Sequence, residues 1–194
     1  MKTNSRQGGG TADFENRRSE IQTRITLGGL AGSGKSTVAR ILSERTGAPV
    51  VSAGKFAREV AEREYGVSIN EFQKLCAKKP ELDARVDASI QGWCAENPSF
   101  IADYHLGFKF VRNALKVLLT VSDQVAAGRI QGASRTGENT DAATICERNE
   151  RMRARFLEKN GVDVTDPMHY DLIIPTDALT PSEIADMILA AASR

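Results

Sequence analysis

The sequence has few cysteines and no arrangement of them that would bind a metal or build a disulfide framework. The three present, Cys76, Cys94 and Cys146, lie far apart and include no C-x-x-C pair, which excludes a zinc site of the usual spacing and a disulfide-stapled secreted domain. Long apolar runs are also lacking, since none approaches the roughly 18 residues that a membrane-spanning helix needs. Residues 1–20 lack the apolar segment of a secretory signal. We therefore expect a soluble, cytoplasmic protein with reduced thiols.

An excess of charge of either sign is missing too. Lysine and arginine total 26 against 25 aspartate and glutamate, and the resulting net charge of +1 gives no general attraction to nucleic acid or anionic lipid. We expect neither as a partner, so any phosphate binding must come from a local site. With 194 residues, of which 41% are hydrophobic, the chain is long enough for one domain with its own core and too short for two large ones. We expect a monomer.

Hydrophobic patterning divides the chain into a leader and one folded domain. Residues 1–22 are polar and without periodicity, which predicts a flexible leader, whereas residues 23–194 alternate apolar runs with segments of helical period. The apolar strands are predicted around Ile25 and Leu27 and at 49–52, 99–104, 115–121 and 170–175. Strands that are apolar throughout and alternate with helices predict a three-layer α/β fold, in which a central five-stranded parallel sheet is covered on both faces.

Two stretches depart from the simple alternation of strand and helix. Residues 54–97 read as a helical insert, and residues 129–161 are rich in arginine, so both are predicted to be mobile flaps over a site. Capping-box spacing marks two helix starts, at Ser68 and Thr180. The predicted helices are 36–47, 55–65, 68–78, 81–96 and 181–193.

A phosphate-binding loop is the clearest motif. Residues 29–36 form a complete G-x-x-x-x-G-K-S between a predicted strand and a predicted helix, which is the context that this motif requires. Its backbone N–H groups and the helix N-terminus favour phosphate oxygens, Lys35 reaches the β- and γ-phosphates, and the Ser36 hydroxyl suits Mg²⁺. The residues predicted to hold a nucleoside triphosphate are Gly29, Leu30, Ala31, Gly32, Ser33, Gly34, Lys35, Ser36 and Thr37. The motif by itself leaves hydrolysis, transfer and switching open.

Several shorter runs keep the order of a known family. They are Ser52-Ala53-Gly54, Phe56, Arg58, Glu71-Phe72, Pro80-Glu81-Leu82-Asp83, Arg148, Arg155-Phe156, 160–164 and 170–174. Together with the phosphate loop they make residues 24–193 resemble the cytidylate kinase family, especially its short archaeal-type branch, within the nucleoside monophosphate kinases. The resemblance implies a P-loop NTPase fold in which 54–97 binds the acceptor nucleotide and 129–161 is an arginine-rich lid.

The resemblance also implies where the acceptor nucleotide binds. Ser52, Gly54 and Arg58 would hold it, and the Arg58 guanidinium has the bidentate donors that suit a phosphate. An arginine early on a helix is also often only solvated. Asp83, Arg85 and Asp87 would lie near the base, and the alternative for all three is an ordinary solvated position on a charged helix.

The residues after the third predicted strand depart from the family pattern. Asp103 ends that strand, where an acidic residue in this fold orients a water on the metal or is simply a polar strand end. The family's Glu-Gly-Arg aligns with Asp103-Tyr104-His105, so the arginine that contacts the acceptor phosphate is missing. His105 would contact the substrate with one donor and carry a full charge in only part of the physiological pH range, or it is an ordinary surface histidine.

Arginines recur at helical spacing in the second insert. Arg148, Arg151 and Arg155 fall on one face of a predicted helix, where a bound polyphosphate would relieve the repulsion between their charges. A solvated helix offset by neighbouring glutamates is the alternative. We expect Arg148 and Arg155 to contact phosphate during catalysis and Arg151 to contact the substrate. Arg129 would resemble the family's adenine-stacking arginine.

These expectations combine into one reaction. We expect an enzyme that uses ATP and Mg²⁺ to phosphorylate a nucleoside monophosphate, with CMP or dCMP as the favoured acceptor. An anionic phosphate oxygen needs no general base. The protein therefore has to position the two nucleotides, neutralise the charge of their phosphates and exclude water. Lys35, Asp103, Arg148 and Arg155 are the predicted catalytic residues. Two alternatives stay open: a P-loop kinase for another small molecule, and a nucleotide-binding regulatory module with weak or no transfer.

Overall fold

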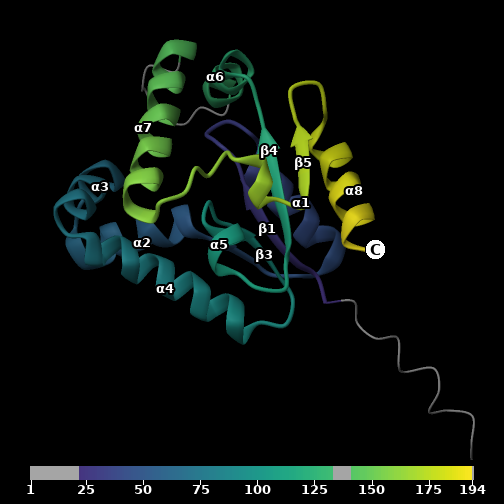
Figure 1. Ribbon diagram of the computed structural model, residues 1–194, viewed down its shortest axis with the longest axis horizontal. Coiled ribbons are helices and arrows are strands. Elements are labelled where there is room, and N and C mark those ends of the chain that lie inside the picture. The colour runs from purple at the N-terminus through teal and green to yellow at the C-terminus, as the bar shows by residue number, and fades with distance from the viewer. Residues whose placement is uncertain (1–21, 133–140, 194) are drawn as a thin grey trace, which may run out of the picture.

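The computed structural model describes residues 22–132 and 141–193 of the chain (Figure 1). The predicted leader, 1–22, therefore lies almost wholly outside the described residues, and so do residues 133–140 of the predicted lid. Within the two described ranges, no helix is long and apolar enough to cross a membrane, and the three cysteines are free thiols.

Five strands form one parallel sheet in the order β2-β3-β1-β4-β5. They are β1 (Arg24–Gly28), β2 (Val50–Ser52), β3 (Phe100–Asp103), β4 (Leu115–Thr120) and β5 (Leu172–Pro175). The predicted five-stranded parallel sheet is thus confirmed, and the predicted strands differ from the observed ones only at their ends. Strand β1 occupies the centre, and its Ile25 and Leu27 are fully buried.

The helices follow the predicted alternation with two additions. They are α1 (Lys35–Thr46), α2 (Ala53–Tyr65), α3 (Ile69–Lys78), α4 (Pro80–Glu96), α5 (Gly107–Phe110), α6 (Asp123–Gly132), α7 (Ala142–Asn160), the 3-10 helix η1 (Pro167–His169) and α8 (Pro181–Ala192). Both capping boxes, at Ser68 and Thr180, are present. The sequence does not predict α5 and α6. Helix α6 buries only Ala126 and Ala127, and small alanines leave little apolar periodicity to detect.

Helices cover the sheet on both faces (Figure 1). On one face Leu42 of α1 and Ile188 of α8 pack in the same core cluster as Leu27 of β1. On the other face Ile90 of α4 packs with Ala102 of β3. Burying side chains of the size of leucine and isoleucine contributes about 1.5 to 3 kcal/mol each, so the two layers hold the sheet and its loops in place.

All five strands run parallel, so their carboxyl ends meet at one edge of the sheet, where open α/β sheets bind ligands. The phosphate loop, residues 29–36, follows the central strand there, between the ends of β3 and β4. Gly28 is in register with Leu118 of β4, and Ser52 of β2 is in register with Asp103 of β3. This edge therefore gathers the predicted donor and acceptor residues.

Gly28, the last residue of β1, is expected to tolerate no side chain. A Cβ there would lie 2.6 Å from Tyr170 Oη and 2.8 Å from its Cε1, and this hydroxyl donates a hydrogen bond of 2.6 Å to Val164 O. Because the ring would have to move, Gly28→Ala should lower the free energy of unfolding by about 1 to 3 kcal/mol in urea denaturation.

Gly92→Ala in α4 is the matched control for this prediction. A Cβ at Gly92 meets nothing within 4 Å, so the change should be neutral or stabilise the protein by up to about 1 kcal/mol. Equal unfolding midpoints for the two variants would contradict the close packing assigned to Gly28.

Candidate active site

The phosphate loop joins β1 to α1. Its Gly29, Gly32 and Gly34 have φ angles of 136°, 78° and 90°, in a region that side chains other than glycine rarely adopt. Two of these positions are also closely packed, since a Cβ at Gly29 would overlap Leu119 O and one at Gly32 would lie 2.6 Å from Ala126 Cβ. The loop ends at the N-terminus of α1, whose free N–H groups and helix dipole favour an anion.

Lys35 turns back into this loop. Its ammonium group donates hydrogen bonds of 2.7 Å to Gly29 O and 2.9 Å to Leu30 O. Burial lowers the pKa of Lys35, while the charge of Asp103 opposes that shift and the charge of Arg148 adds to it. Loop oxygens thus solvate the ammonium group in place of water, at the position where a triphosphate tail is predicted.

Ser36 and Asp103 come together across 67 positions of sequence, where Ser36 Oγ donates a hydrogen bond of 2.8 Å to Asp103 Oδ2. A hydroxyl and a carboxylate are the hard oxygen ligands that Mg²⁺ prefers. Among the described residues, no group of three or more His, Cys, Asp and Glu side chains could hold a metal. The pair therefore fits a magnesium ion that takes its other ligands from water and phosphate, as this ion usually does.

Arg129 of α6, the predicted adenine-stacking residue, lies against the loop. It donates hydrogen bonds of 3.3 Å to Gly32 O, and of 3.0 Å and 2.6 Å to Thr176 Oγ1 and O. These bonds use the edge of the guanidinium plane, whereas stacking on a base would use its face. The contacts hold Arg129 beside the donor site.

Asn149 of α7 also touches the loop, and the sequence analysis does not identify it. Its Oδ1 accepts a hydrogen bond of 3.2 Å from Ala31 N–H, and the residue is buried. The one signal for it is helical spacing, because Asn149 follows the buried Ile145 by one turn on the same helix.

Ser52, Gly54 and Arg58 lie together at the start of α2. Ser52 is the N-cap, and its Oγ accepts a hydrogen bond of 3.4 Å from Lys55 N–H. The Arg58 guanidinium lies over Gly54, where a Cβ would be 3.6 Å from Arg58 Nη1. Since Ser52 is in register with Asp103, this group stands beside the Ser36–Asp103 pair. Its role toward an acceptor stays a prediction.

Asp83 and Asp87 of α4 each meet a partner from another element. Lys159 of α7 donates a hydrogen bond of 2.5 Å to Asp83 Oδ2 and one of 3.1 Å to Cys76 O. The Tyr104 hydroxyl donates one of 2.8 Å to Asp87 Oδ1, and burial raises the pKa of Asp87. Asp83 therefore joins the helical insert to α7, and Asp87 is held beside the end of β3.

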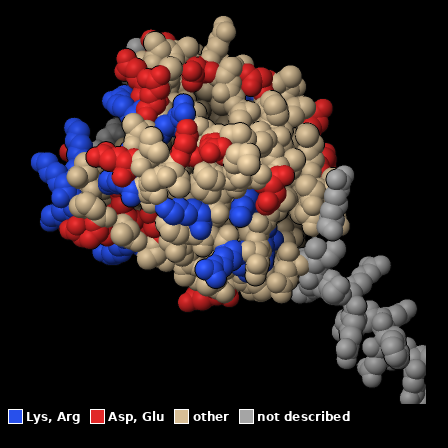
Figure 2. Space-filling view, in the orientation of Figure 1, with Lys and Arg blue, Asp and Glu red and all other residues tan. Residues whose placement is uncertain are grey.

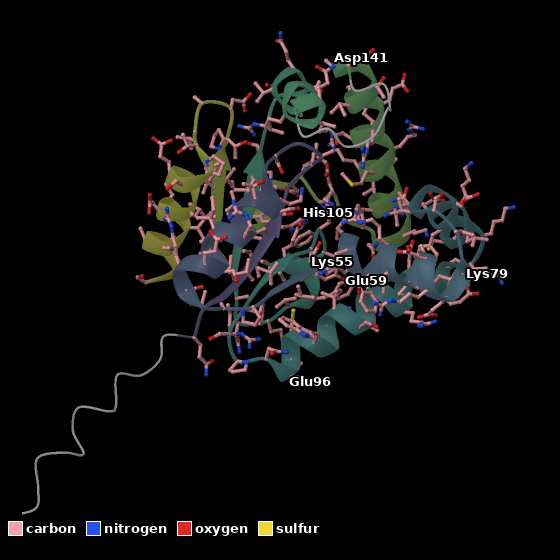
Figure 3. The ribbon with its side chains drawn as sticks, turned by 180° about the vertical axis from the view of Figure 1, so that it is seen from behind. Lys55, Glu59, Lys79, Glu96, His105 and Asp141 are labelled. Atoms are coloured by element: carbon pink, nitrogen blue, oxygen red, sulfur yellow. The ribbon has the colours of Figure 1, made fainter. Side chains whose placement is uncertain are left out.

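His105 lies toward the middle of the molecule (Figure 3). Its ring centroid is 5.5 Å from that of Phe156 on α7, and its Nδ1 atom is buried with no hydrogen-bond partner among the described residues. Burial lowers the pKa of His105 to about 3, and the charges of Lys35 and Arg155 add to the shift. The expectation of a charge in part of the physiological range is therefore wrong, because partial burial and two neighbouring cations together hold the pKa of the ring below that range.

The arginines of α7 occupy different environments. Arg151 is 75% exposed and lies 4.0 Å from Glu147 of its own helix. Arg153 donates a hydrogen bond of 2.7 Å to Asp163 Oδ2. Acidic and basic side chains are interspersed over this side of the molecule, at the left of Figure 2. These two arginines thus have carboxylate partners at the surface.

The charges of Arg148 and Arg155 act on residues of the predicted site. Arg148 is exposed and acts on the pKa of Lys35. Arg155 is half-buried, with its guanidinium carbon 5.2 Å from the Phe156 ring centroid, and its charge acts on the pKa of His105. A concentration of positive charge beside the phosphate loop is what a polyphosphate ligand would neutralise.

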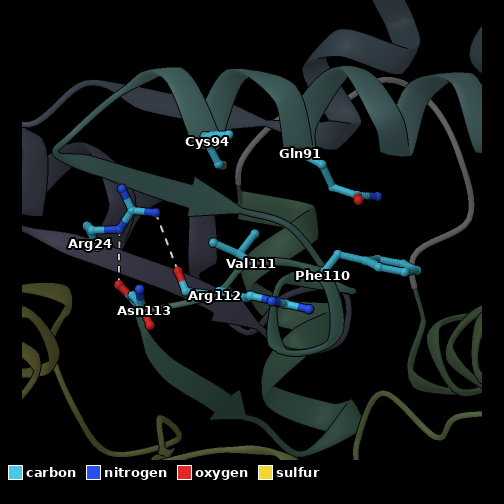
Figure 4. A pocket seen from close by; sticks show the side chains of 8 residues that line it. Arg24, Gln91, Cys94, Phe110, Val111, Arg112 and Asn113 are labelled. Atoms are coloured by element: carbon cyan, nitrogen blue, oxygen red, sulfur yellow. Dashed lines mark hydrogen bonds between the residues drawn. The ribbon is translucent and has the colours of Figure 1, made fainter.

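A cavity of about 220 Å³ lies at the opposite, amino-terminal edge of the sheet, against Cys94 of α4 (Figure 4). Arg24 of β1 lines it and donates hydrogen bonds to the carbonyl oxygens of Asn97, Arg112 and Asn113. The guanidinium thus ties together the chain segments that enter β3 and β4, and the cavity lies apart from the phosphate loop.

Comparison of the sequence with known proteins finds one matching family and several relatives. Residues 28–155 match the family described as an AAA domain. The chain is 42% identical over 158 residues to the cytidylate kinase of Methanothermobacter thermautotrophicus, covering 79% of this chain and 94% of that protein. It is 45% identical over 169 residues to the S-adenosylmethionine-dependent nucleotide dehydratase of Lacinutrix mariniflava, covering 87% of this chain. The chain spans only 36% of the length of that dehydratase.

Solved structures agree with the fold. The shikimate kinase of Bacteroides thetaiotaomicron superimposes with a TM-score of 0.60 at 16% identity, covering 89% of this chain and 99% of that one. Likeness at this level of identity concerns the fold alone. It confirms the three-layer α/β architecture of the P-loop type.

Proposed function

This chain belongs to the AAA-domain family of P-loop kinases, and from that membership we propose that it transfers the γ-phosphoryl group of ATP to a nucleoside monophosphate, with CMP or dCMP favoured. One observation carries the proposal: a phosphate loop with Lys35 and a cluster of Ser52 and Arg58 flank Asp103 at one edge of the sheet. Relatives named as cytidylate kinases and as a nucleotide dehydratase both support a nucleotide ligand.

The donor side suits a triphosphate. The loop N–H groups other than that of Ala31, which is bonded to Asn149, would bind the β- and γ-phosphate oxygens together with the Lys35 ammonium, and Lys35 would exchange its loop carbonyls for them. Ser36 would hold Mg²⁺ directly and Asp103 through a bound water, and the ion would neutralise charge on the phosphate oxygens. Arg129 would stack on the adenine.

The predicted acceptor residues lie on the other side of Asp103 from the phosphate loop. Arg58 would align the acceptor phosphate through its bidentate donors. Asp87, held in place by Tyr104, offers a carboxyl oxygen of the kind that accepts a hydrogen bond from the cytosine amino group. Such a contact would favour CMP or dCMP over UMP, whose base has no amino group.

Transfer of the phosphoryl group requires positioned substrates and positive charge around the phosphates, and it requires no removal of a proton. The attacking oxygen of a nucleoside monophosphate is already anionic, so no base is needed. Arg148 and Arg155 would stabilise the charge that develops on the transferring group, while a closed site keeps water from taking it.

One observation favours a second acceptor class. Burial lowers the pKa of His105, which lies where the resemblance to cytidylate kinases implies an arginine toward the acceptor phosphate. A neutral imidazole binds a phosphate more weakly than a guanidinium does. A P-loop kinase for a small molecule other than a nucleotide is therefore the second candidate.

A coupled assay with ATP and Mg²⁺ against CMP, dCMP, UMP, AMP and GMP tests the proposal. We expect CMP or dCMP to exceed the others in kcat/KM by at least about tenfold, the discrimination expected of one good contact to a base edge. Failure with all five acceptors would reject the proposal. ADP release at the same rate with and without acceptor would also contradict it, because a transfer site must exclude water.

A further inference from the structure

Asn149 is a buried polar residue whose two side-chain hydrogen bonds both leave its own helix. It is 4% exposed, although its neighbours Arg148 and Glu150 are exposed. Its Oδ1 accepts a hydrogen bond of 3.2 Å from Ala31 N–H, and its Nδ2 donates one of 3.2 Å to Asp123 Oδ1. A buried amide is unfavourable unless it is hydrogen-bonded, so these two partners fix the orientation of the side chain.

The contact falls where α6 and α7 both meet the phosphate loop. Ala31 N–H is bonded to α7, while the next residue, Gly32, packs against Ala126 of α6 and accepts a hydrogen bond from Arg129. Two successive residues of the loop, Ala31 and Gly32, are therefore each held by a different helix. Because the loop would bind phosphate through the directions of its N–H groups, the orientation of these peptides decides how well a triphosphate fits.

Helix α7 also carries the arginines assigned to the transferring phosphoryl group. Arg148 directly precedes Asn149, and Arg155 lies about two turns further along. We propose that Asn149 is a positioning residue that fixes the phosphate loop against α7, so that the loop N–H groups and the α7 arginines face one triphosphate. The role of Asn149 in phosphoryl transfer rests on the proposed function, whereas its role in ATP binding does not.

Exchanging donor and acceptor between Asn149 and Asp123 tests this inference. Asn149→Asp keeps an oxygen for Ala31 N–H but places a second carboxylate oxygen against Asp123, so that two like charges meet. We expect this variant to bind MgATP at least about tenfold more weakly, the effect of disrupting one buried hydrogen bond. Adding Asp123→Asn supplies a donor to the new carboxylate, and the double variant should recover most of the lost affinity.

Calorimetric titration of MgATP measures binding, and steady-state assays give kcat and the separate KM values for ATP and CMP. In Asn149→Asp the KM for ATP should rise about tenfold, while the KM for CMP should change less than about twofold, because the disturbed contact with Asp123 orients the side chain that holds the donor loop. Asn149→Ser removes both bonds without adding charge and should act in the same direction. Glu158→Gln, exposed on the same helix, is the matched control and should change neither.

The outcomes separate positioning from plain stability. Variants that melt at lower temperature but, while folded, bind MgATP as the wild type does would overturn the inference. A double variant no better than Asn149→Asp would overturn it as well. Weakened ATP binding in a protein that phosphorylates no acceptor would contradict the proposed function alone. A wild-type protein that binds no MgATP would overturn both.

Discussion

Replacing Arg155 by alanine is expected to lower kcat by about 10³- to 10⁵-fold, the range found for arginines that stabilise phosphoryl-transfer transition states. Arg155 is half-buried, and its charge acts on the pKa values of both Asp87 and His105. Its charge therefore acts on the predicted acceptor side of the site, and we expect it to stabilise the negative charge that develops on the transferring group. Steady-state turnover at saturating ATP and CMP measures the effect.

Arg153→Ala is the matched control for Arg155→Ala. It removes an arginine from the same helix, but one whose guanidinium is bonded to Asp163. Because this ion pair is largely exposed, its loss should lower the free energy of unfolding by less than about 1 kcal/mol and leave kcat near the wild-type value. Wild-type turnover in Arg155→Ala, or an equal loss in both variants, would defeat the role given to Arg155.

Lys35→Ala should lower kcat/KM for ATP by at least about 10²- to 10³-fold, the effect of removing one preorganised donor from a charge-stabilising site. Burial lowers the pKa of Lys35, which means that its charged form is incompletely solvated by the loop. A triphosphate is the counter-charge that would stabilise it most, so the ammonium group should contribute to binding and to turnover alike. Calorimetry with MgATP and steady-state kinetics measure the two contributions.

Lys79→Ala provides the comparison for Lys35→Ala, because Lys79 is exposed at the far edge of the helical insert (Figure 3). It should bind and turn over ATP as the wild type does. Removing Lys35 also deprives the carbonyls of Gly29 and Leu30 of a donor, so the melting temperature of that variant has to be measured alongside. A folded Lys35→Ala protein with unchanged MgATP affinity would contradict the role of the phosphate loop in binding ATP.

Local signals account for the elements that were predicted well. The capping boxes at Ser68 and Thr180 each involve residues three positions apart, so the sequence contains the whole interaction. The phosphate loop is also recognisable from a short segment, because Gly32 and Gly34 have positive φ angles that favour glycine at these positions. Helix α6 escaped prediction because its buried side chains are alanines, which give little apolar periodicity.

The environment of a residue was harder to predict than its position. His105 was correctly placed after β3, but its ordinary pKa predicted partial charge, whereas burial beside Lys35 and Arg155 leaves it neutral. The bond from Lys159 to Asp83 has no signal in the sequence, and a role of Asp83 near a base stays a prediction. In both cases the deciding neighbours come from helices distant in sequence, and desolvation and pairing depend on those neighbours.

The sequence by itself determined that five apolar strands alternate with helices and that a phosphate-binding loop follows the first of them, because strand period, capping and glycine conformation are properties of short segments. Only the tertiary structure decided the strand order, the Ser36–Asp103 pair and the contact of Asn149 with Ala31, whose partners are 118 positions apart. Such contacts depend on how the layers pack, and packing joins residues that no local pattern relates.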